Sequence, residues 1–513
     1  MVTILSQSLV KSSLVVAVMT LISRLMGFAR DIVIANLFGV SAATDAFFVA
    51  FRIPNFLRRL FAEGAFANAF VPTLTQLDKQ ADTDSLQGFI ARSAGSLGLV
   101  LFGLSLLGVV LAPLLIVVFA PGFIWQGGQY ALSIQFLQIT FPYLLFIGLT
   151  AFAGSILNAK GRFAVPALTP VMLNLVLILA AIYLAPQMTE PVTALAWGVL
   201  LAGILQLVLQ FPALMHAGLL PRPRLGFTDP HVRQMLKSMP SAIFGVSVVQ
   251  INLLVDTVFA SFLPVGSISW LYYSDRLVEF PLGILGGTLA AVILPRLANH
   301  HALEDQAGFS KSLDWGLKCL VLLGLPASIG LSLLAEPIIA SLFQHQAFSA
   351  SDTIMASRSL TAFASGLLGF VMIKILVPGF TARHDTQTPL RLGYYSVLAN
   401  VIFNAVLLLP LAHAGPALAT SLAAYLNAAG LLVIMIKRGI YQPESGWRGF
   451  LLRIVFANLV MATCLYLWLE ADLWGVWNLD KHSLQLLISI LGALIVYAVA
   501  LLVSGVRPSS LKY

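Results

Sequence analysis

The sequence has few cysteines and few charged side chains. Only two cysteines occur in 513 residues, Cys319 and Cys464, and both lie in apolar stretches. This excludes a disulfide framework and a CxxC metal or redox site. Charged residues make up 10% of the chain, against about 25% in soluble domains. The chain also lacks HExxH, Walker A and G-x-S-x-G motifs, which excludes the enzyme sites that those motifs mark.

The chain is rich in apolar residues. Apolar residues make up 59% of it and its mean hydropathy is +0.93, which predicts an all-α polytopic membrane protein. The first apolar stretch has no small-residue cleavage site and is interrupted by Arg24, so we interpret it as a retained span rather than a signal peptide. Fourteen spans of about 20 residues are predicted near residues 13–38, 44–72, 90–118, 131–157, 164–186, 193–216, 236–262, 269–295, 312–342, 355–380, 389–411, 415–436, 448–470 and 483–505.

The net charge of +8 reflects membrane topology and gives no reason to expect nucleic acid as a partner. Lysines and arginines cluster in alternate loops, as at Lys160 with Arg162 and at Lys437 with Arg438, whereas most intervening loops have none. Basic loops stay in the cytoplasm. We therefore expect both termini in the cytoplasm, membrane lipids as the surroundings, and periplasmic loops near residues 39–43, 119–130, 187–192, 263–268, 343–354 and 412–414.

Landmarks of the first half recur about 223 residues later, which indicates an internal repeat. The pairs are Pro72 and Pro295, Pro113 and Pro337, Phe119 and Phe343, Pro166 and Pro389, Pro186 and Pro410, and residues 194–196 and 417–419. Each unit holds six spans, an even number, so the two copies have parallel orientation and typically enclose a substrate site near the membrane midplane. We predict an N-lobe over 1–218, a C-lobe over 219–440 and two additional helices over 441–513.

Arginines lie inside several predicted spans. Arg24 and Arg30 occur in the first span, Arg52, Arg58 and Arg59 in the second, and Arg276 in the eighth. An arginine at bilayer depth costs about 2.5 to over 10 kcal/mol, so it faces a bundle interior or a watery cavity. The guanidinium fork suits phosphate or carboxylate. The pattern predicts a cationic cavity for an anionic ligand, a phosphate or pyrophosphate.

Acidic and polar residues near these arginines have two interpretations. Arg276 and Glu279 are three residues apart and can pair on one helix. The acids either neutralise the arginines in buried ion pairs that anchor helices or support and gate the cavity. The supporting set comprises Asp31, Asp45, Arg52, Arg59, Glu63, Ser269, Asp275 and Glu279. Lys374 and Arg358 in the tenth span either serve the cavity or extend to the membrane interface.

Two further carboxylates are candidates for a monovalent cation or proton site. Asp256 lies in the seventh span with no basic residue at helical spacing, and an intramembrane carboxylate is a functional candidate. Asp385, in the segment RHDTQTP, is the second candidate. The alternatives are a hydrogen-bonded carboxyl for Asp256 and a helix cap for Asp385.

Three segments carry a resemblance to a known family: SRLMGFARDIVIANLFGVSAATDAFFVAFRIPNFLRRLFAEGAFANAFVP, WLYYSDRLVEFPLGILG and DTQTP. They resemble the MurJ (MviN) lipid II flippases of the multidrug/oligosaccharidyl-lipid/polysaccharide exporter superfamily. In that family the essential cavity arginines match Arg24, Arg30, Arg58 and Arg276, and Asp45, Ser269 and Glu279 are also at motif positions. The family's last two helices form a groove for the lipid tail, and some members bind sodium through the seventh and eleventh spans.

The resemblance implies a transporter rather than an enzyme. The expected activity is transfer of lipid II, the undecaprenyl-pyrophosphate-linked disaccharide-pentapeptide of peptidoglycan, from the cytoplasmic to the periplasmic leaflet of the bacterial inner membrane. No cofactor is expected, and Na⁺, H⁺ or the membrane potential would supply the energy. The cell-wall synthesis machinery is an expected partner, and the chain is expected to be a monomer. The alternatives are export of another polyprenyl-linked oligosaccharide or of drugs, and an enzyme acting on a lipid pyrophosphate.

Overall fold

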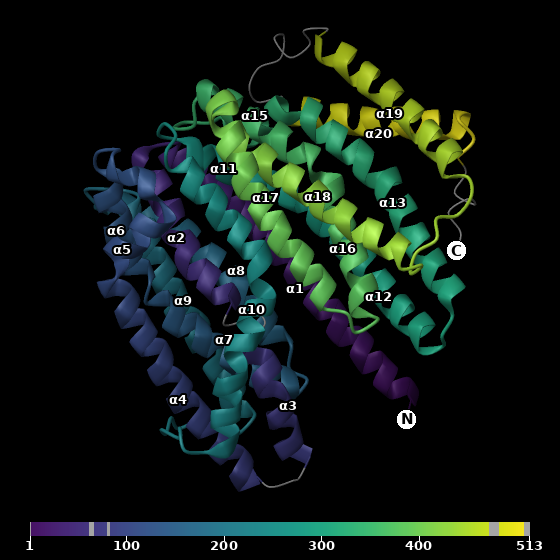
Figure 1. Ribbon diagram of the computed structural model, residues 1–513. Helices are drawn as coiled ribbons and strands as arrows, with labels where there is room; N and C mark the ends of the chain where they lie inside the picture. Colours follow the sequence, from purple (N-terminus) through teal and green to yellow (C-terminus); the bar gives the residue numbers. More distant parts are fainter. Residues whose placement is uncertain (1, 61–65, 80–82, 471–481, 507–513) are drawn as a thin grey trace. The chain divides into compact units, whose positions relative to one another are not determined.

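The computed structural model describes residues 2–60, 66–79, 83–470 and 482–506, and every regular element in these ranges is helical (Figure 1). Eleven helical segments of the described chain are long and apolar enough to span a membrane. They coincide with eleven of the fourteen predicted spans. The other three spans fall on α1 (Val2–Phe38), on α2 (Ala42–Leu60) with α3 (Phe66–Lys79), and on α10 (Pro230–Ala260). The chain is therefore a multi-pass helical membrane protein, and the count of fourteen spans stays a prediction.

Matching helix breaks support the internal repeat. The helix α4 (Thr83–Val110) is separated from α5 (Ala112–Phe119) by Leu111, with φ −85° and ψ 6°. About 223 residues later, α13 (Gln306–Leu333) is separated from α14 (Ala335–Phe343) by Leu334, with φ −93° and ψ 12°. A proline lies two residues after the first break and three residues after the second, in the first turn of the following helix. Since it has no N–H to donate to the carbonyl four residues earlier, it interrupts the preceding helix. The predicted continuous spans 90–118 and 312–342 are thus each two helices.

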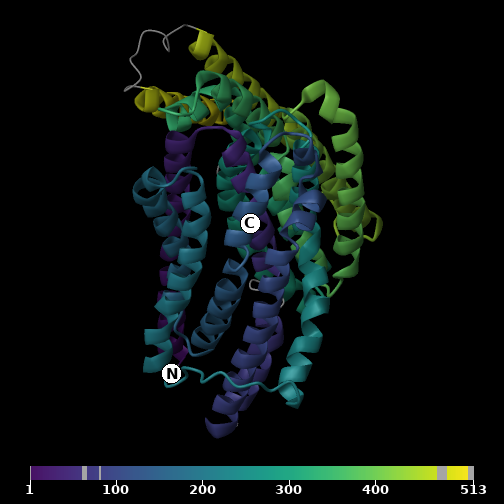
Figure 2. The ribbon, with the colours of Figure 1, turned by 90° about the vertical axis from the view of Figure 1, so that its left-hand side faces the viewer.

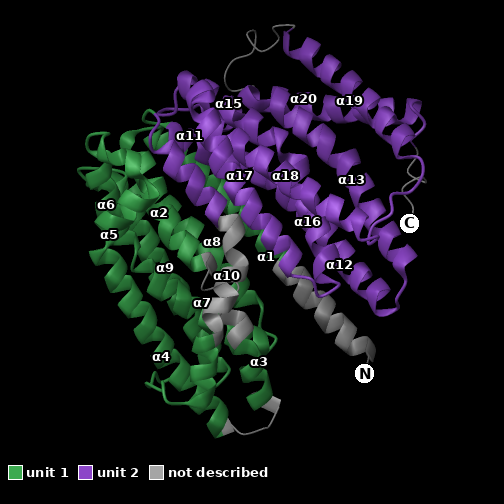
Figure 3. Cartoon of the chain, viewed as in Figure 1, with its two compact units in different colours: residues 1–250, 264–266 green, residues 251–263, 267–513 purple. Residues whose placement is uncertain are grey.

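The chain divides into two compact units (Figure 3). Unit 1 comprises residues 1–250 and 264–266, and unit 2 comprises residues 251–263 and 267–513. The remaining helices of unit 1 are α6 (Gln129–Thr140), α7 (Tyr143–Ala159), α8 (Ala164–Leu179) and α9 (Thr193–His216). Within it α1 packs on α8, α2 on α6, and α7 on α9. Buried aromatic rings fill this core. The centre of the Phe70 ring lies 5.4 Å from that of Phe89 and 5.0 Å from that of Phe152.

The segment that follows α9 is bound to α4, because a glycine lets the two backbones approach. Arg224 N–H donates to the carbonyl of Ala91 at 3.0 Å, and Gly226 N–H donates to Ser96 Oγ at 3.0 Å. A Cβ on Gly95 would come within 2.2 Å of the Arg224 carbonyl oxygen. Unit 1 therefore continues past residue 218, and the predicted lobe boundaries at 218 and 440 stay predictions.

Unit 2 ends in a pair of helices, α19 (Trp447–Glu470) and α20 (His482–Val503), which pack against each other (Figure 2). The pair also contacts α13 and α14. Its contact surface includes Met461 and Tyr497, against which Ile329 packs. The Tyr497 hydroxyl donates to the carbonyl of Leu322 on α13 at 2.7 Å. The two additional helices are thus attached to unit 2 through α13. The other helices of unit 2 are α11 (Ser267–Pro281), α12 (Gly287–Ala302), α15 (Ala350–Ser365), α16 (Leu367–Thr381), α17 (Gln387–Leu411) and α18 (Ala414–Lys437).

A buried carboxylate fixes the connection between α18 and α19. Asp314 on α13 is fully buried, and its Oδ1 accepts from the Tyr441 hydroxyl and from Trp447 Nε1, each at 2.6 Å. Lys318 Nζ lies 2.6 Å from the other oxygen and 2.7 Å from Glu444. Buried polar groups need such partners, so this network determines where the connection leaves α18 and where α19 begins.

Candidate functional sites in the two units

Arg30 is the most deeply buried of the predicted cavity arginines with described side chains. Its side chain is 7% exposed, and Nη2 lies 2.6 Å from Oδ1 of Asp31, whose side chain is 2% exposed. Nη1 donates to Asn174 Oδ1 at 3.0 Å, and Asn174 Nδ2 donates to the Ser23 carbonyl at 3.2 Å. Asn174 therefore ties α8 to α1 around the guanidinium. In this structure Arg30 has an anchoring ion pair, the alternative that the sequence left open for Asp31.

Arg24 differs from Arg30 although both lie on α1. Its side chain is exposed, and no ion pair joins it to a described residue. An exposed arginine in an apolar segment retains its full charge and its donors. No ion pair to a described residue would therefore have to break for Arg24 to contact an anion.

The second span carries three arginines on α2, and their described surroundings differ. Arg58 is half-buried, and its Nε donates to Asn55 Oδ1 at 2.9 Å. Arg52 is also half-buried. The Arg59 side chain and Glu63 lie outside the described residues, so their supporting roles stay predictions.

Asp45 holds a loop at the beginning of α2. It is buried, and its Oδ2 accepts from the backbone N–H of Gly266 at 2.7 Å. Gly266 has φ +100°, a conformation that side chains with a Cβ rarely adopt. A fixed carboxylate and a glycine turn together explain why the loop at 264–266 belongs to unit 1. Asp45 thus has a structural role in addition to any effect on the arginines.

In unit 2, Arg276 pairs with Glu279 as its spacing predicted. Nη1 lies 2.8 Å from Glu279 Oε2, and the two side chains are 26% and 41% exposed. The guanidinium carbon also lies 5.1 Å from the centre of the Tyr272 ring, within the range of a cation–π interaction. Ser269 is buried and Asp275 is half-buried on the same helix, α11. Because this ion pair is partly exposed, solvent screens it and an incoming anion can replace Glu279.

Asp256 lies at the centre of a buried polar cluster in unit 2. Its Oδ1 accepts from Asn404 Nδ2 at 3.0 Å and Asn400 Nδ2 at 3.3 Å, and its Oδ2 accepts from Thr420 Oγ1 at 2.6 Å. The Oδ1 atom of Asn404 is buried and has no hydrogen-bond partner among the described residues. Carboxylate, amide and hydroxyl oxygens are the ligands that hard cations prefer, so the residues present fit a small monovalent cation.

Asp385 has different surroundings, on the loop before α17. It accepts from Thr388 N–H at 3.0 Å and Thr388 Oγ1 at 2.6 Å, and it pairs with Arg438 at 2.8 Å. Burial raises the pKa of Asp385, but the Thr388 hydrogen bonds and the Arg438 charge together hold this pKa below its usual value. Asp385 therefore acts as a helix cap and ion-pair partner here. It shares none of these contacts with Asp256.

Several polar residues of these clusters were not predicted from the sequence. They are Asn174, Asn400, Asn404 and Thr420. The available signal was weak: two asparagines four residues apart in an apolar span would lie on one helical face. Lys374, for which two roles were open, is exposed and lies against Gly286, where a Cβ would come within 2.6 Å of its Cδ atom.

The helical multi-pass fold and the arginines on its apolar helices are typical of a membrane transporter. Comparison with known proteins gives the particular family. The family model for lipid II flippase MurJ matches residues 34–484, and the chain belongs to this family. The "Probable lipid II flippase MurJ" of Vibrio cholerae serotype O1 is 44% identical, covering 99% of this chain and 98% of the relative. The "Lipid II flippase MurJ" of Burkholderia cenocepacia is 39% identical over 90% of each chain.

Solved structures agree with this assignment. A lipid II flippase MurJ in an inward closed conformation matches with a TM-score of 0.80 and 29% identity, covering 95% of this chain and 98% of that one. A multidrug resistance MATE family transporter in an inward-facing conformation matches with a TM-score of 0.65 and 14% identity, over 83% and 98% of the two chains. The second likeness shows the shared fold alone. The predicted fold class and family are confirmed.

Proposed function

We propose that this protein transfers lipid II from the cytoplasmic to the periplasmic leaflet of the bacterial inner membrane, as a step of peptidoglycan synthesis. The observation that carries the proposal is the state of two arginines in segments predicted to span the membrane: Arg24 on α1 is exposed, and the Arg276 side chain on α11 is 26% exposed. A pyrophosphate group needs such donors, because moving it unpaired through hydrocarbon is very costly. Family membership points to the same ligand.

The proposed cycle moves the headgroup through a cavity while the isoprenoid tail stays in lipid. Arg24 and Arg276 bind the pyrophosphate, with Arg276 exchanging Glu279 for the ligand. Arg30, held by Asp31 and Asn174, contributes positive potential and fixes α1 against α8, while Arg58 assists closure. Rocking of the two lobes would then expose the headgroup to the periplasm. The apolar pair α19 and α20 would guide the tail.

The Asp256 cluster is the proposed energy-coupling site. Asp256, Asn400, Asn404 and Thr420 would hold Na⁺ through their oxygen atoms, and a bound cation would compensate the buried carboxylate charge. A proton on Asp256 would serve the same purpose. The membrane potential adds about 2.3 kcal/mol per unit charge per 100 mV. Asp385, already paired with Arg438, is the less suited of the two predicted candidates.

The remaining expectations concern the setting of the protein. The basic loops favour a cytoplasmic position for both termini, and we expect a monomer. The cell-wall synthesis machinery would receive the product. These assignments are part of the proposal, and cysteine-accessibility labelling of residues near each terminus would test the orientation.

The test of the function is accessibility of lipid II to a periplasmic probe in cells depleted of their endogenous flippase. Cells supplied with the parent chain should regain accessibility, whereas Arg24→Ala and Arg276→Ala should not, at equal membrane abundance. Arg391→Ala is the matched control, since Arg391 is an exposed arginine at the beginning of α17. Failure of the abundant parent would exclude lipid II and favour another polyprenyl-linked substrate. Full activity of both cavity variants would exclude their proposed roles.

Coupling is tested separately by exchanging Na⁺ for choline and by Asp256→Asn. Na⁺ coupling predicts loss of lipid II accessibility in choline and in the variant. If the parent transports lipid II equally in Na⁺ and in choline while Asp256→Asn is inactive in both, the result would instead indicate proton coupling. Normal transport by Asp256→Asn under both conditions would rule out Asp256 as the coupling residue.

A further inference from the structure

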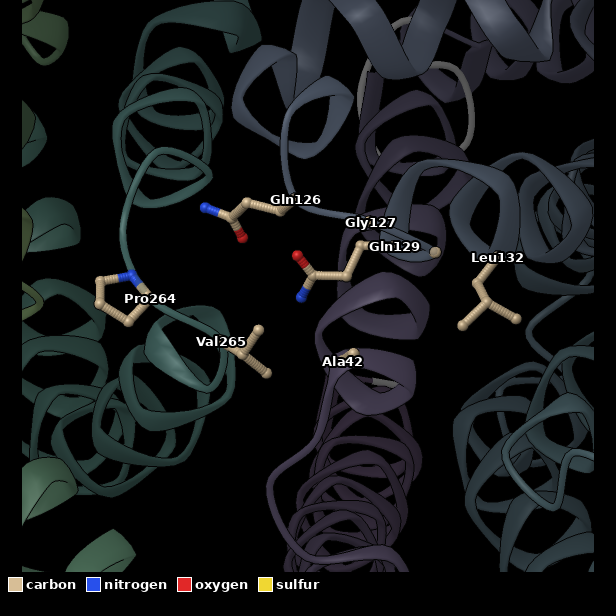
Figure 4. Close-up of a pocket in the computed structure, with 8 residues that line it drawn as sticks. Ala42, Gln126, Gly127, Gln129, Leu132, Pro264 and Val265 are labelled. Carbon is tan, nitrogen blue, oxygen red and sulfur yellow. The ribbon is translucent and has the colours of Figure 1, made fainter.

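A pocket of about 520 Å³ lies in unit 1 where α2 and α6 begin. Figure 4 shows its walls. Two glutamines and two glycines line it together with apolar side chains: Gln126, Gln129, Gly127, Gly128, Ala42, Leu132, Pro264 and Val265. All three contributing loops are among those predicted to be periplasmic. The Asp45–Gly266 hydrogen bond holds one of these loops in place, so the pocket is built on fixed backbone.

The side chain of Gln129 is buried at this pocket and makes no hydrogen bond to a described residue. The residue is 1% exposed, and neither Oε1 nor Nε2 has a hydrogen-bond partner among the described residues. Burying an unpaired amide is costly, and most buried polar side chains are satisfied. Gln206, also 1% exposed, differs in that its Nε2 donates to the Thr169 carbonyl at 2.8 Å, so only its Oε1 is without a partner among the described residues. The fold itself therefore gives no reason for an amide at position 129.

The chemistry of the lining defines the class of ligand. A primary amide offers one acceptor and two donors without net charge. Figure 4 shows the Gln126 and Gln129 side chains directed toward each other across the pocket, with Pro264 and Val265 beside them. None of the lining residues is charged, so neither a phosphate nor a cation is favoured. A neutral group with one acceptor, one donor and a small apolar part would satisfy both the amide and the walls.

We propose that this pocket binds a secondary amide carrying an adjacent methyl group. The ligand carbonyl would accept from Gln129 Nε2, its N–H would donate to Gln129 Oε1, and the methyl group would contact Ala42 and Val265. An N-acetylated sugar and an alanyl peptide both present this group. A role in receiving the headgroup on the periplasmic side rests on the proposed transport function, and binding itself does not.

The test uses saturation-transfer NMR on the purified full chain in nanodiscs. The probes are N-acetylglucosamine, the uncharged dipeptide N-formyl-alanyl-alanine amide, and glucose as the control without an amide. We expect transfer to the methyl group of at least one amide probe, and which probe responds identifies the source. Gln129→Leu should reduce this transfer at least tenfold while its melting temperature stays equal or rises, because no hydrogen bond to a described residue is lost. Gln206→Leu should keep the transfer and melt at a lower temperature.

A second variant distinguishes loss of ligand binding from loss of folding. Val265 is 47% exposed, so Val265→Phe should fill the pocket without disturbing the core, and it should also abolish the transfer. Absence of transfer above glucose in the parent would overturn the proposal and leave ordered water as the partner of Gln129. Transfer in Gln129→Leu and Val265→Phe that equals the transfer in the parent would overturn it as well. If the parent binds a probe but does not restore lipid II accessibility in cells, the proposed transport function is refuted, whereas the proposed ligand binding in the pocket stands.

Discussion

Arg30→Ala should destabilise the protein strongly, whereas Arg24→Ala should not, although both remove an arginine from one helix. Arg30 and Asp31 have side chains that are 7% and 2% exposed, so the substitution would leave a buried carboxylate without its counter-charge. Removal of one partner of a buried ion pair costs about 3–5 kcal/mol. The lost hydrogen bond to Asn174 acts in the same direction. For the exposed Arg24 we expect a change within about 0.5 kcal/mol.

The assay is thermal unfolding of the two purified variants beside the parent, together with membrane abundance and lipid II accessibility in depleted cells. Arg24→Ala should be abundant and inactive. Arg30→Ala should melt at a clearly lower temperature, so its loss of transport would follow at least partly from loss of folded protein. The double variant Arg30→Met with Asp31→Asn removes both charges together. It should regain most of the lost stability, because replacing a whole buried pair is often nearly neutral.

Equal melting temperatures for Arg30→Ala and the parent would refute this reasoning, since they would mean that Asp31 does not depend on Arg30 in the folded protein. The double variant also tests an alternative cause of the destabilisation. If it is less stable than Arg30→Ala, the destabilisation comes from lost packing of the arginine stem rather than from the uncompensated carboxylate.

Three further predictions concern the supporting structure. Gly95→Ala should lower the melting temperature and weaken hydrogen-exchange protection of the following segment, because the new Cβ would meet the Arg224 carbonyl; Gly103→Ala, with open space at its Cβ, is the control. Asp314→Ala should cost about 3–5 kcal/mol and increase exchange in α19, and unchanged exchange would contradict the network described above. Because the pKa of Asp385 is lowered by folding, its contribution to stability is complete above about pH 4 and is lost as the pH falls further. Below that pH, the melting temperature of Asp385→Asn should therefore fall less steeply with pH than that of the parent. An equally steep fall in both proteins would rule out this contribution of Asp385.

The fold could be predicted from the sequence to the extent that its signals are local. Apolar runs mark the spans, and prolines at a constant offset mark the repeat, which reappears as matching breaks at Leu111 and Leu334. The pairing of Arg276 with Glu279 followed from a spacing of three residues and is confirmed. The breaks within single spans were not predicted, because hydropathy averages over the residues on which a helix ends.

The polar clusters could not be predicted, because their members are far apart in sequence. Asp256 bonds to side chains 144 and 148 residues later, and Asp45 bonds to a backbone N–H 221 residues later. Nothing in the local pattern distinguishes Asn174 from another polar residue on an apolar helix. Only the packing of α8 on α1 places its amide against Arg30.

These long-range contacts change the charge argument that began with the sequence. In the sequence, the first two predicted spans hold five arginines and three acidic residues, which is a surplus of arginine. In the structure, Asp31 compensates Arg30 at 2.6 Å, while Asp45 accepts from the backbone of a loop. Arg24 has no ion pair with a described residue, and the ion pair of Arg276 with Glu279 is partly exposed. A ligand anion gains most where the charge is least compensated, which is why Arg24 and Arg276, rather than Arg30, should determine affinity for the pyrophosphate.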